Sequence, residues 1–129
     1  QAAVASVRAA QLYDLEVLNP SINTQKNNTT RFVVLSNQKL YTKDADNISI
    51  SFTLPHESGS LYNALGHFIF NGLNMTSIES EPLPERKWEY RFFITFDGNL
   101  GDASVQNAIS GVRSESSDFK LLGNYCIEI

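Results

Sequence analysis

The sequence predicts an α+β domain in which two helices cover one face of an antiparallel, four-stranded sheet. Two periodic patterns of apolar residues support this prediction. In some segments apolar and polar side chains alternate with the period of a strand, and in two others apolar residues recur at i, i+3, i+4 and i+7, as in a helix that packs on one face. Turn residues separate the segments in the order strand, helix, strand, strand, helix, strand. The 129 residues are 42% hydrophobic and 19% charged, which suits one such core.

The first part of the chain, residues 1–36, predicts a helix-strand remnant of a different, α/β domain. Ala2–Tyr13 is rich in good helix formers, and its small residues favour close packing against neighbours that a larger protein would supply. Leu15–Leu18 is a short strand candidate that Asn19-Pro20 ends. Phe32–Leu35 is a continuous apolar run, the form of a strand buried on both faces of its sheet.

Residues 37–45 are polar with little periodicity and are the predicted linker to a second domain, residues 46–129. That domain opens with a predicted strand whose apolar residues face a core and whose polar residues face outward. The apolar set is Ile48, Ile50, Phe52 and Leu54, and the polar set is Asn47, Ser49, Ser51 and Thr53.

A helix then begins at Ser58-Gly59-Ser60 and ends at Asn71-Gly72, with apolar residues Leu61, Ala64, Leu65 and Phe68. Met75–Glu81 is the second strand, and a turn at Pro82–Pro84 leads to the third, in which Trp88, Tyr90, Phe92, Ile94 and Phe96 alternate until Asp97-Gly98. The second helix carries Val105, Ala108, Ile109 and Val112, and Phe119–Tyr125 is the last strand. Right-handed crossovers close this βαββαβ order into a ferredoxin-like fold.

Composition excludes several classes of function. A net charge of -4 and a pI near 5.0 disfavour nucleic-acid partners, and no apolar stretch approaches the roughly 20 residues of a membrane span. The single cysteine, Cys126, fits a reducing compartment, so we expect a cytoplasmic protein. His56 and His67 lack partners at metal-ligand spacing, and the glycines form no phosphate loop. We therefore predict neither a metal nor a cofactor.

The segment Asn27-Asn28-Thr29-Thr30-Arg31-Phe32 combines a hydroxyl, a fixed cation and an aromatic ring at the entrance to an apolar run. It predicts a corner of an anion-binding active site. Without any family resemblance, Thr30 is better explained as a capping hydroxyl at a strand entrance, and Arg31 could equally clamp a carboxylate in bidentate fashion or anchor the domain through an ion pair.

Residues 46–125 resemble an ACT domain of the subtype that responds to phenylalanine. The family's Gly-Ala-Leu motif appears as Gly59-Ser60-Leu61, and its Asn-x-Thr-x-Ile-Glu-Ser-Arg-Pro motif appears as Asn74 to Pro82, with Glu81 in the arginine position. The resemblance implies L-phenylalanine as an allosteric ligand, with its carboxylate at the backbone of the helix opening and the pocket completed by Asn74, Ile78, Glu79 and Ser80. It also implies side-by-side homodimers. The reversed charge at Glu81 would call for a compensating base, for which Arg86 and Lys87 are the candidates.

The preceding segment resembles the end of the catalytic domain of prephenate dehydratase, through Ala2 to Ser6 and Asn27 to Phe32, and Leu122-Gly123-Asn124-Tyr125 is similar to that family's ending. The resemblance implies a lyase of phenylalanine biosynthesis that converts prephenate to phenylpyruvate, CO2 and water, and that is a dimer or a tetramer at full length. It implies a catalytic role for Thr30, which would assist departure of the ring hydroxyl, and for Arg31 and Phe32 beside it.

Two other functions stay open at this point. The chain could be a stand-alone or differently attached ACT sensor, or a ferredoxin-like interaction module without a ligand. The segment Ala2–Phe32 favours the dehydratase, because it resembles catalytic and not regulatory sequence. We expect the 129-residue chain to bind phenylalanine without turning over prephenate, since a catalytic cleft needs a second lobe.

Overall fold

The structure is a computed structural model that describes residues 2–24, 30–38, 41–86 and 88–127. The chain divides into two compact units, residues 1–35 and residues 36–129. The division falls at the end of the apolar run Phe32–Leu35. Three residues of the predicted anion-binding segment, Asn27, Asn28 and Thr29, lie outside the described residues.

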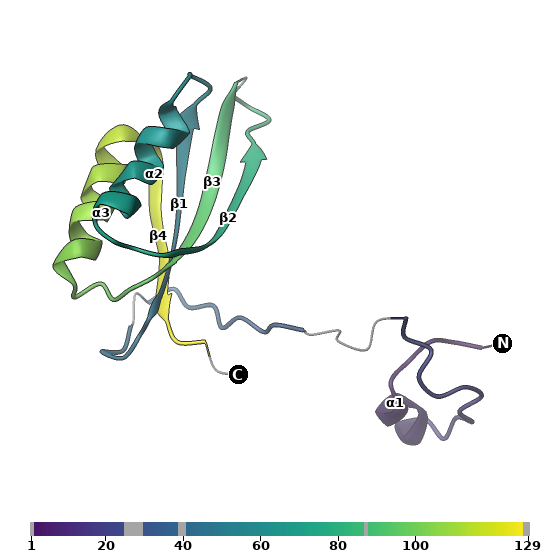
Figure 1. Ribbon diagram of the computed structural model, residues 1–129. Helices are drawn as coiled ribbons and strands as arrows, with labels where there is room; N and C mark the ends of the chain where they lie inside the picture. Colours follow the sequence, from purple (N-terminus) through teal and green to yellow (C-terminus); the bar gives the residue numbers. More distant parts are fainter. Residues whose placement is uncertain (1, 25–29, 39–40, 87, 128–129) are drawn as a thin grey trace. The chain divides into compact units, whose positions relative to one another are not determined.

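The second unit has the predicted ferredoxin-like fold (Figure 1). Its four strands form one antiparallel sheet in the order β2-β3-β1-β4, and α2 and α3 lie together on one face of it. The opposite face, which carries no helix, is called the open face below. The elements are β1 (Asn47–Pro55), α2 (Ser60–Phe70), β2 (Met75–Pro82), β3 (Glu89–Asp97), α3 (Ala103–Glu115) and β4 (Ser117–Tyr125).

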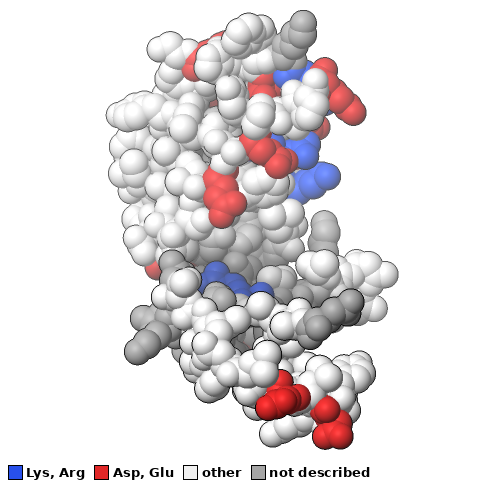
Figure 2. Space-filling model, turned by 90° about the vertical axis from the view of Figure 1, so that its right-hand side faces the viewer, with Lys and Arg blue, Asp and Glu red and all other residues white. Residues whose placement is uncertain are grey.

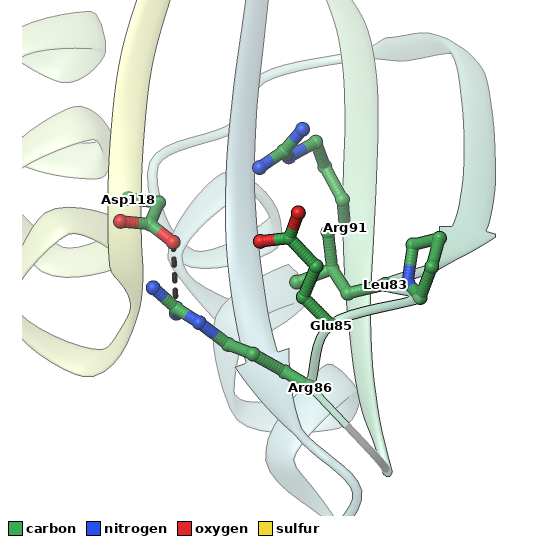
Figure 3. Close-up of a pocket in the computed structure, with 6 residues that line it drawn as sticks. Leu83, Glu85, Arg86, Arg91 and Asp118 are labelled. Atoms are coloured by element: carbon green, nitrogen blue, oxygen red, sulfur yellow. Dashed lines mark ion pairs between the residues drawn. The ribbon is translucent and has the colours of Figure 1, made fainter.

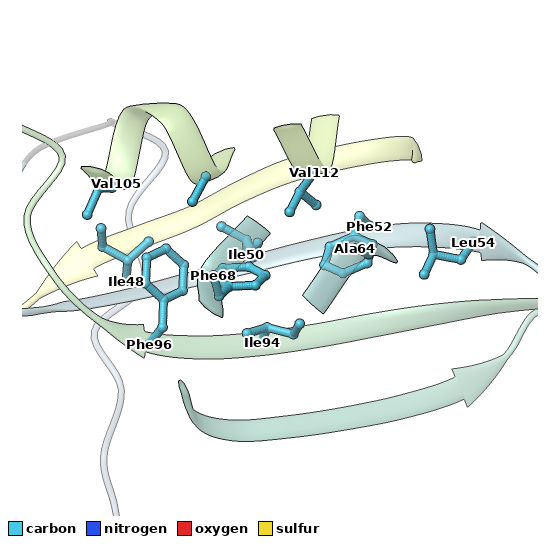
Figure 4. Close-up of a cluster of buried hydrophobic side chains, with 11 residues drawn as sticks. Ile48, Ile50, Phe52, Leu54, Ala64, Phe68, Ile94, Phe96, Val105 and Val112 are labelled. Carbon is cyan, nitrogen blue, oxygen red and sulfur yellow. The ribbon is translucent and has the colours of Figure 1, made fainter. Parts of the chain in front are cut away.

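The hydrophobic core lies between the helices and the sheet (Figure 4). Both helices contribute the residues that their 3.6-residue periodicity predicts, because each turns one apolar stripe toward the strands. Phe68 of α2 meets Phe96 of β3 edge to face, with ring centroids 5.0 Å apart. The fully buried set is Ile48, Ile50, Phe52, Leu54, Ala64, Phe68, Ile94, Phe96, Val105, Ala108 and Val112.

The polar face of β1 differs from the sequence prediction. Ser51 and Thr53 were expected to face outward, yet they are 4% and 0% exposed. β1 is a central strand, and its small side chains have the larger Phe93 and Arg91 of β3 as cross-strand partners on the open face. These neighbours cover the small residues without any helix on that side.

Strand β3 begins one residue later than its alternation predicts. Trp88 has a φ of 73° and is 75% exposed, so it belongs to the turn and not to the strand. A tryptophan in the left-handed region is uncommon, because its side chain crowds the backbone there. The local bonding is nonetheless well defined, since the His56 N–H donates to the Trp88 carbonyl at 2.8 Å.

Among the described residues of the first unit there is one short helix, α1 (Val7–Leu12), which begins later than the predicted Ala2 because Ser6 caps it. The Ser6 hydroxyl accepts a hydrogen bond from the Ala9 N–H at 3.2 Å. A serine at this position satisfies one of the free donors of the first turn and so fixes the start of the helix.

The two strands predicted in the first unit are wrong. Neither Leu15–Leu18 nor Phe32–Leu35 forms a ladder with any described residue, and the side chains of the second run are 73–95% exposed. A strand exists only through its partners, so an apolar run without a neighbouring strand stays irregular. Among the described residues, no helix is long and apolar enough to cross a membrane.

Candidate ligand site at the start of helix α2

A pocket of about 420 Å³ opens at the start of α2, on the helix-bearing side of the sheet. It joins the end of β1, the loop that follows, the first turn of α2 and one end of strands β2 and β3. Its lining residues are Leu54, Pro55, His56, Glu57, Gly59, Ser60, Leu61, Tyr62, Ser80, Tyr90 and Phe92. The walls are therefore mainly apolar and aromatic, with a few polar groups, which is the usual make-up of a small-molecule site.

The helix opening supplies the polar end of this pocket. Gly59 precedes the helix with a φ of 87°, a conformation that glycine adopts without strain, and it has no side chain to cap the first turn. The hydroxyl of Ser60 donates to the carbonyls of Pro55 and Glu57 at 2.9 and 2.7 Å, so it fixes the loop. N–H groups of the first turn, at the positive end of the helix dipole, can thus receive an anion.

An aromatic wall stands at the mouth of the pocket. The His56 ring lies 5.7 Å from the Tyr90 ring and 6.0 Å from the Trp88 ring, tilted against both. Sequence reasoning missed His56 as a site residue and treated Tyr90 as core. The available signal was the register of β1 and β3, which pairs Leu54 with Tyr90 and brings the residues after Leu54 to the start of β3.

The pocket joins four of the seven residues predicted to bind phenylalanine: Gly59, Ser60, Leu61 and Ser80. Ile78 lies on the same face of β2 as Ser80, because it pairs with the core residue Ile94, and it is 47% exposed. Glu79 pairs with Phe93 on the open face, and Asn74 precedes the far end of β2, where its amide donates to Asp97 at 2.8 Å. Glu79 and Asn74 therefore do not meet this pocket within one chain.

The residues predicted to be catalytic line neither of the two pockets described here. Thr30, Arg31 and Phe32 are exposed and irregular, and the Phe32 side chain is 89% exposed. No described residues form a group of three or more histidine, cysteine or acidic side chains able to hold a metal ion.

The base opposite Glu81 is Arg91, its cross-strand partner in the pairing of β2 and β3. Of the two bases predicted to compensate for Glu81, Arg86 instead pairs with Glu89 at 3.3 Å and Asp118 at 2.9 Å, and Lys87 lies outside the described residues. In the upper part of Figure 2, basic side chains lie next to acidic ones and form no continuous basic patch.

Comparison with known proteins gives the family of the chain. The family model described as prephenate dehydratase matches residues 1–40. The bifunctional chorismate mutase/prephenate dehydratase of Aquifex aeolicus is 37% identical over 123 residues, which are 95% of this chain and 34% of that protein. This chain belongs to the prephenate dehydratase family. The similarity to this relative extends through both units, whereas the family model covers the first unit and only the first five residues of the second.

Other members of the family support the same assignment. Arogenate dehydratase 1 of Petunia hybrida is 33% identical over an alignment of 143 positions, which covers 99% of this chain and 34% of that protein. The crystal structure of prephenate dehydratase from Arthrobacter aurescens, a complex with L-Phe, matches with a TM-score of 0.60 and 27% identity over 71% of this chain and 30% of that chain. The chain thus spans about a third of the length of the curated relatives it matches.

Proposed function

We propose that this chain supplies the phenylalanine-sensing part of a prephenate dehydratase. Residues 46–129 would be an ACT domain that binds L-phenylalanine for feedback control, and residues 1–36 would belong to the catalytic domain that converts prephenate to phenylpyruvate, CO2 and water. Residues 37–45 would join the two domains. A cytoplasmic location for the protein stays a prediction.

One observation carries the ligand proposal. Gly59, Ser60 and Leu61 line the same pocket as Ser80, although the two groups come from separate motifs of the sequence. A free amino acid needs a donor for its carboxylate and an apolar slot for its ring. The helix opening offers the first, and the side chains of Tyr90 and Phe92 offer the second. The L-Phe complex of the Arthrobacter aurescens relative supports the choice of ligand.

The catalytic residues would act only in a larger assembly. Thr30 and Arg31 are exposed side chains that would assist loss of the ring hydroxyl and hold a carboxylate once a second lobe faces them. Contact with that lobe would then bury the four exposed apolar residues from Phe32 to Leu35. We therefore expect the 129-residue chain to bind phenylalanine but not to turn over prephenate.

A two-fold dimer would complete the site. β2 is an edge strand whose residues are exposed along most of its length, and α2 exposes Tyr62, Ile69 and Phe70. Unpaired strand edges and exposed apolar side chains favour pairing with a second copy. Asn74, which does not meet the pocket within one chain, could then reach the ligand from the partner. The full-length enzyme would be a dimer or a tetramer through this contact.

Calorimetry and thermal unfolding with L-phenylalanine test the proposal. A ligand at a hundredfold excess over its Kd, bound only by the folded state, adds about 2.7 kcal/mol to the unfolding free energy. For a domain of this size the expected rise in Tm is roughly 10–20 °C. Absence of both heat and thermal shift at millimolar L-phenylalanine would remove the ligand proposal.

A matched pair of variants locates the site. Gly59→Asp places a carboxylate at the helix opening, where it competes with that of the ligand, and should abolish the response. Gly72→Asp is the control: Gly72 also has positive φ, 67° against 87°, and an added Cβ at either glycine meets no atom within 4 Å. Equal loss of binding in both variants would show that backbone strain, and not the site, was responsible.

A further inference from the structure

The loop between β2 and β3 lines a hollow on the open face of the sheet, opposite the face that carries the proposed ligand pocket. On the helix side is the proposed ligand pocket. On the open face is a hollow of about 270 Å³ lined by Leu83, Pro84, Glu85, Arg86, Arg91 and Asp118 (Figure 3). Tyr90 and Arg91 are consecutive residues of β3 and point to opposite faces, the first into the ligand pocket and the second into the open-face hollow.

Arg86 fastens this loop across the sheet. Its guanidinium lies 2.9 Å from the carboxylate of Asp118, at the start of the edge strand β4, so the contact reaches past β1 (Figure 3). It also lies 3.3 Å from Glu89, at the start of β3. The hydrogen bond to Glu89 and the charges of both carboxylates raise the pKa of Arg86 above its ordinary value. The pair Arg86–Asp118 is called the clasp below.

Two residues with a strained backbone occur here, one a member of the clasp and the other in the same loop as Arg86. Trp88 and Asp118 have φ values of 73° and 50°, a region that residues with a side chain rarely adopt. Such conformations persist where the surrounding contacts over-determine them, and they gather at functional sites. Backbone bonds support the loop as well, since the Leu83 N–H donates to Glu89 at 3.1 Å and the Glu89 N–H donates to Arg86 at 3.2 Å.

The same loop reaches the ligand pocket through Trp88. The Trp88 carbonyl accepts the His56 N–H, and the Trp88 ring lies against the His56 ring, which lines the pocket. Movement of the loop would therefore displace the aromatic wall formed by His56 and Tyr90. A contact on the open face is in this way connected to a pocket on the other face by only a few residues.

We propose that Arg86, held by Asp118, is a positioning residue of the ligand site: it fixes the β2–β3 loop so that Trp88 keeps His56 against the pocket. The inference rests on the proposed function for its ligand. Its mechanical part, that the clasp holds Trp88, does not depend on any ligand. Trp88 is the chain's single tryptophan, so its fluorescence reports on this loop alone.

The experiment compares four proteins with the unaltered chain. Arg86→Gln and Asp118→Asn each break the clasp, and asparagine tolerates the left-handed backbone at position 118. The double variant Arg86→Asp/Asp118→Arg restores an ion pair with reversed charges. Arg113→Gln is the matched control, because Arg113 stacks on Phe119 at 4.8 Å and lies outside the hollow. Each protein is measured by time-resolved fluorescence anisotropy of Trp88 without ligand and by calorimetry with L-phenylalanine.

Both single variants should increase the fast motion of Trp88 and weaken L-phenylalanine binding by about two- to fivefold, the range expected for a partly exposed ion pair. The double variant should recover part of the lost L-phenylalanine affinity and part of the lost rigidity of Trp88. The Arg113 control should change neither the affinity nor the motion of Trp88. Unchanged anisotropy in both single variants overturns the inference, as does weaker binding without added motion of Trp88. If the unaltered chain does not bind L-phenylalanine, the proposed function fails, while the anisotropy result still decides whether the clasp holds the loop.

Discussion

Replacing Gly111 with alanine tests the packing of the two helices that cover the sheet. Gly111 lies in α3 where the ring of His67, from α2, comes against it. A Cβ added at Gly111 would stand 2.2 Å from His67 Nδ1 and 2.6 Å from Cγ. Real Cβ atoms do not approach other atoms this closely, so the imidazole would have to move. His67 would then leave Glu115, whose carboxylate lies 3.1 Å from Nε2.

Two opposing contributions set the size of the effect. Alanine in place of glycine inside a helix stabilises it by about 0.8–1.0 kcal/mol. Overpacking a well-filled contact costs about 1–3 kcal/mol. Gly111→Ala in the unaltered chain should therefore lower the unfolding free energy by about 0–2 kcal/mol. In a His67→Ala background the overlapping ring is gone, so the same substitution should raise the unfolding free energy by about 0.8 kcal/mol.

Urea unfolding of the four proteins in this double-mutant cycle measures the difference directly. The interaction free energy between the two positions should be about 1–3 kcal/mol, the overpacking cost alone. The decisive feature is the change of sign between the two backgrounds. If Gly111→Ala stabilised the chain equally with histidine or alanine at position 67, the close contact between α2 and α3 would not exist in solution.

Further predictions concern the core, the buried polar groups and the clasp. Phe68→Ala removes a fully buried ring and should cost about 3–5 kcal/mol in urea unfolding. Asn124→Ala leaves the backbone groups that Asn124 bonds without partners in a buried site and should cost about 1–3 kcal/mol, measured the same way. Thr53→Val should be neutral or stabilising in thermal unfolding, because the Thr53 hydroxyl is buried and has no hydrogen-bond partner among the described residues. An arginine is already charged at neutral pH, and the hydrogen bond to Glu89 and the nearby carboxylates raise the pKa of Arg86 further, so its charge is lost only as pH rises through that raised pKa and Trp88 anisotropy should not change from pH 7 to about 10.

The fold of the second unit could be predicted from sequence because the patterns that specify it are local. The alternation from Ile48 to Leu54 and the helical spacing from Leu61 to Phe68 each recur within a few residues, and the structure confirms both elements. The prediction of a strand at Phe32–Leu35 was wrong because a strand is defined by its partner strands, and a local sequence pattern does not identify those partners. The burial of Thr53 was not predicted for a related reason, since the residue that covers it, Arg91, belongs to a neighbouring strand.

The candidate site shows what a sequence motif does not predict, namely the face of the sheet on which each of its residues lies. Glu79 and Ser80 are adjacent in one motif, and the resemblance placed both in the same pocket, but successive residues of a strand point to opposite faces. The pairing of Ser80 with Phe92 keeps Ser80 on the pocket side, while the pairing of Glu79 with Phe93 turns it to the open face. A direct role for Glu79 at the ligand's ammonium group would therefore require a different strand register or a group from a second chain. Glu79→Gln separates these cases: with the observed register and a single chain, L-phenylalanine affinity should stay within a factor of two by calorimetry, and a loss beyond tenfold would place its carboxylate at the ligand.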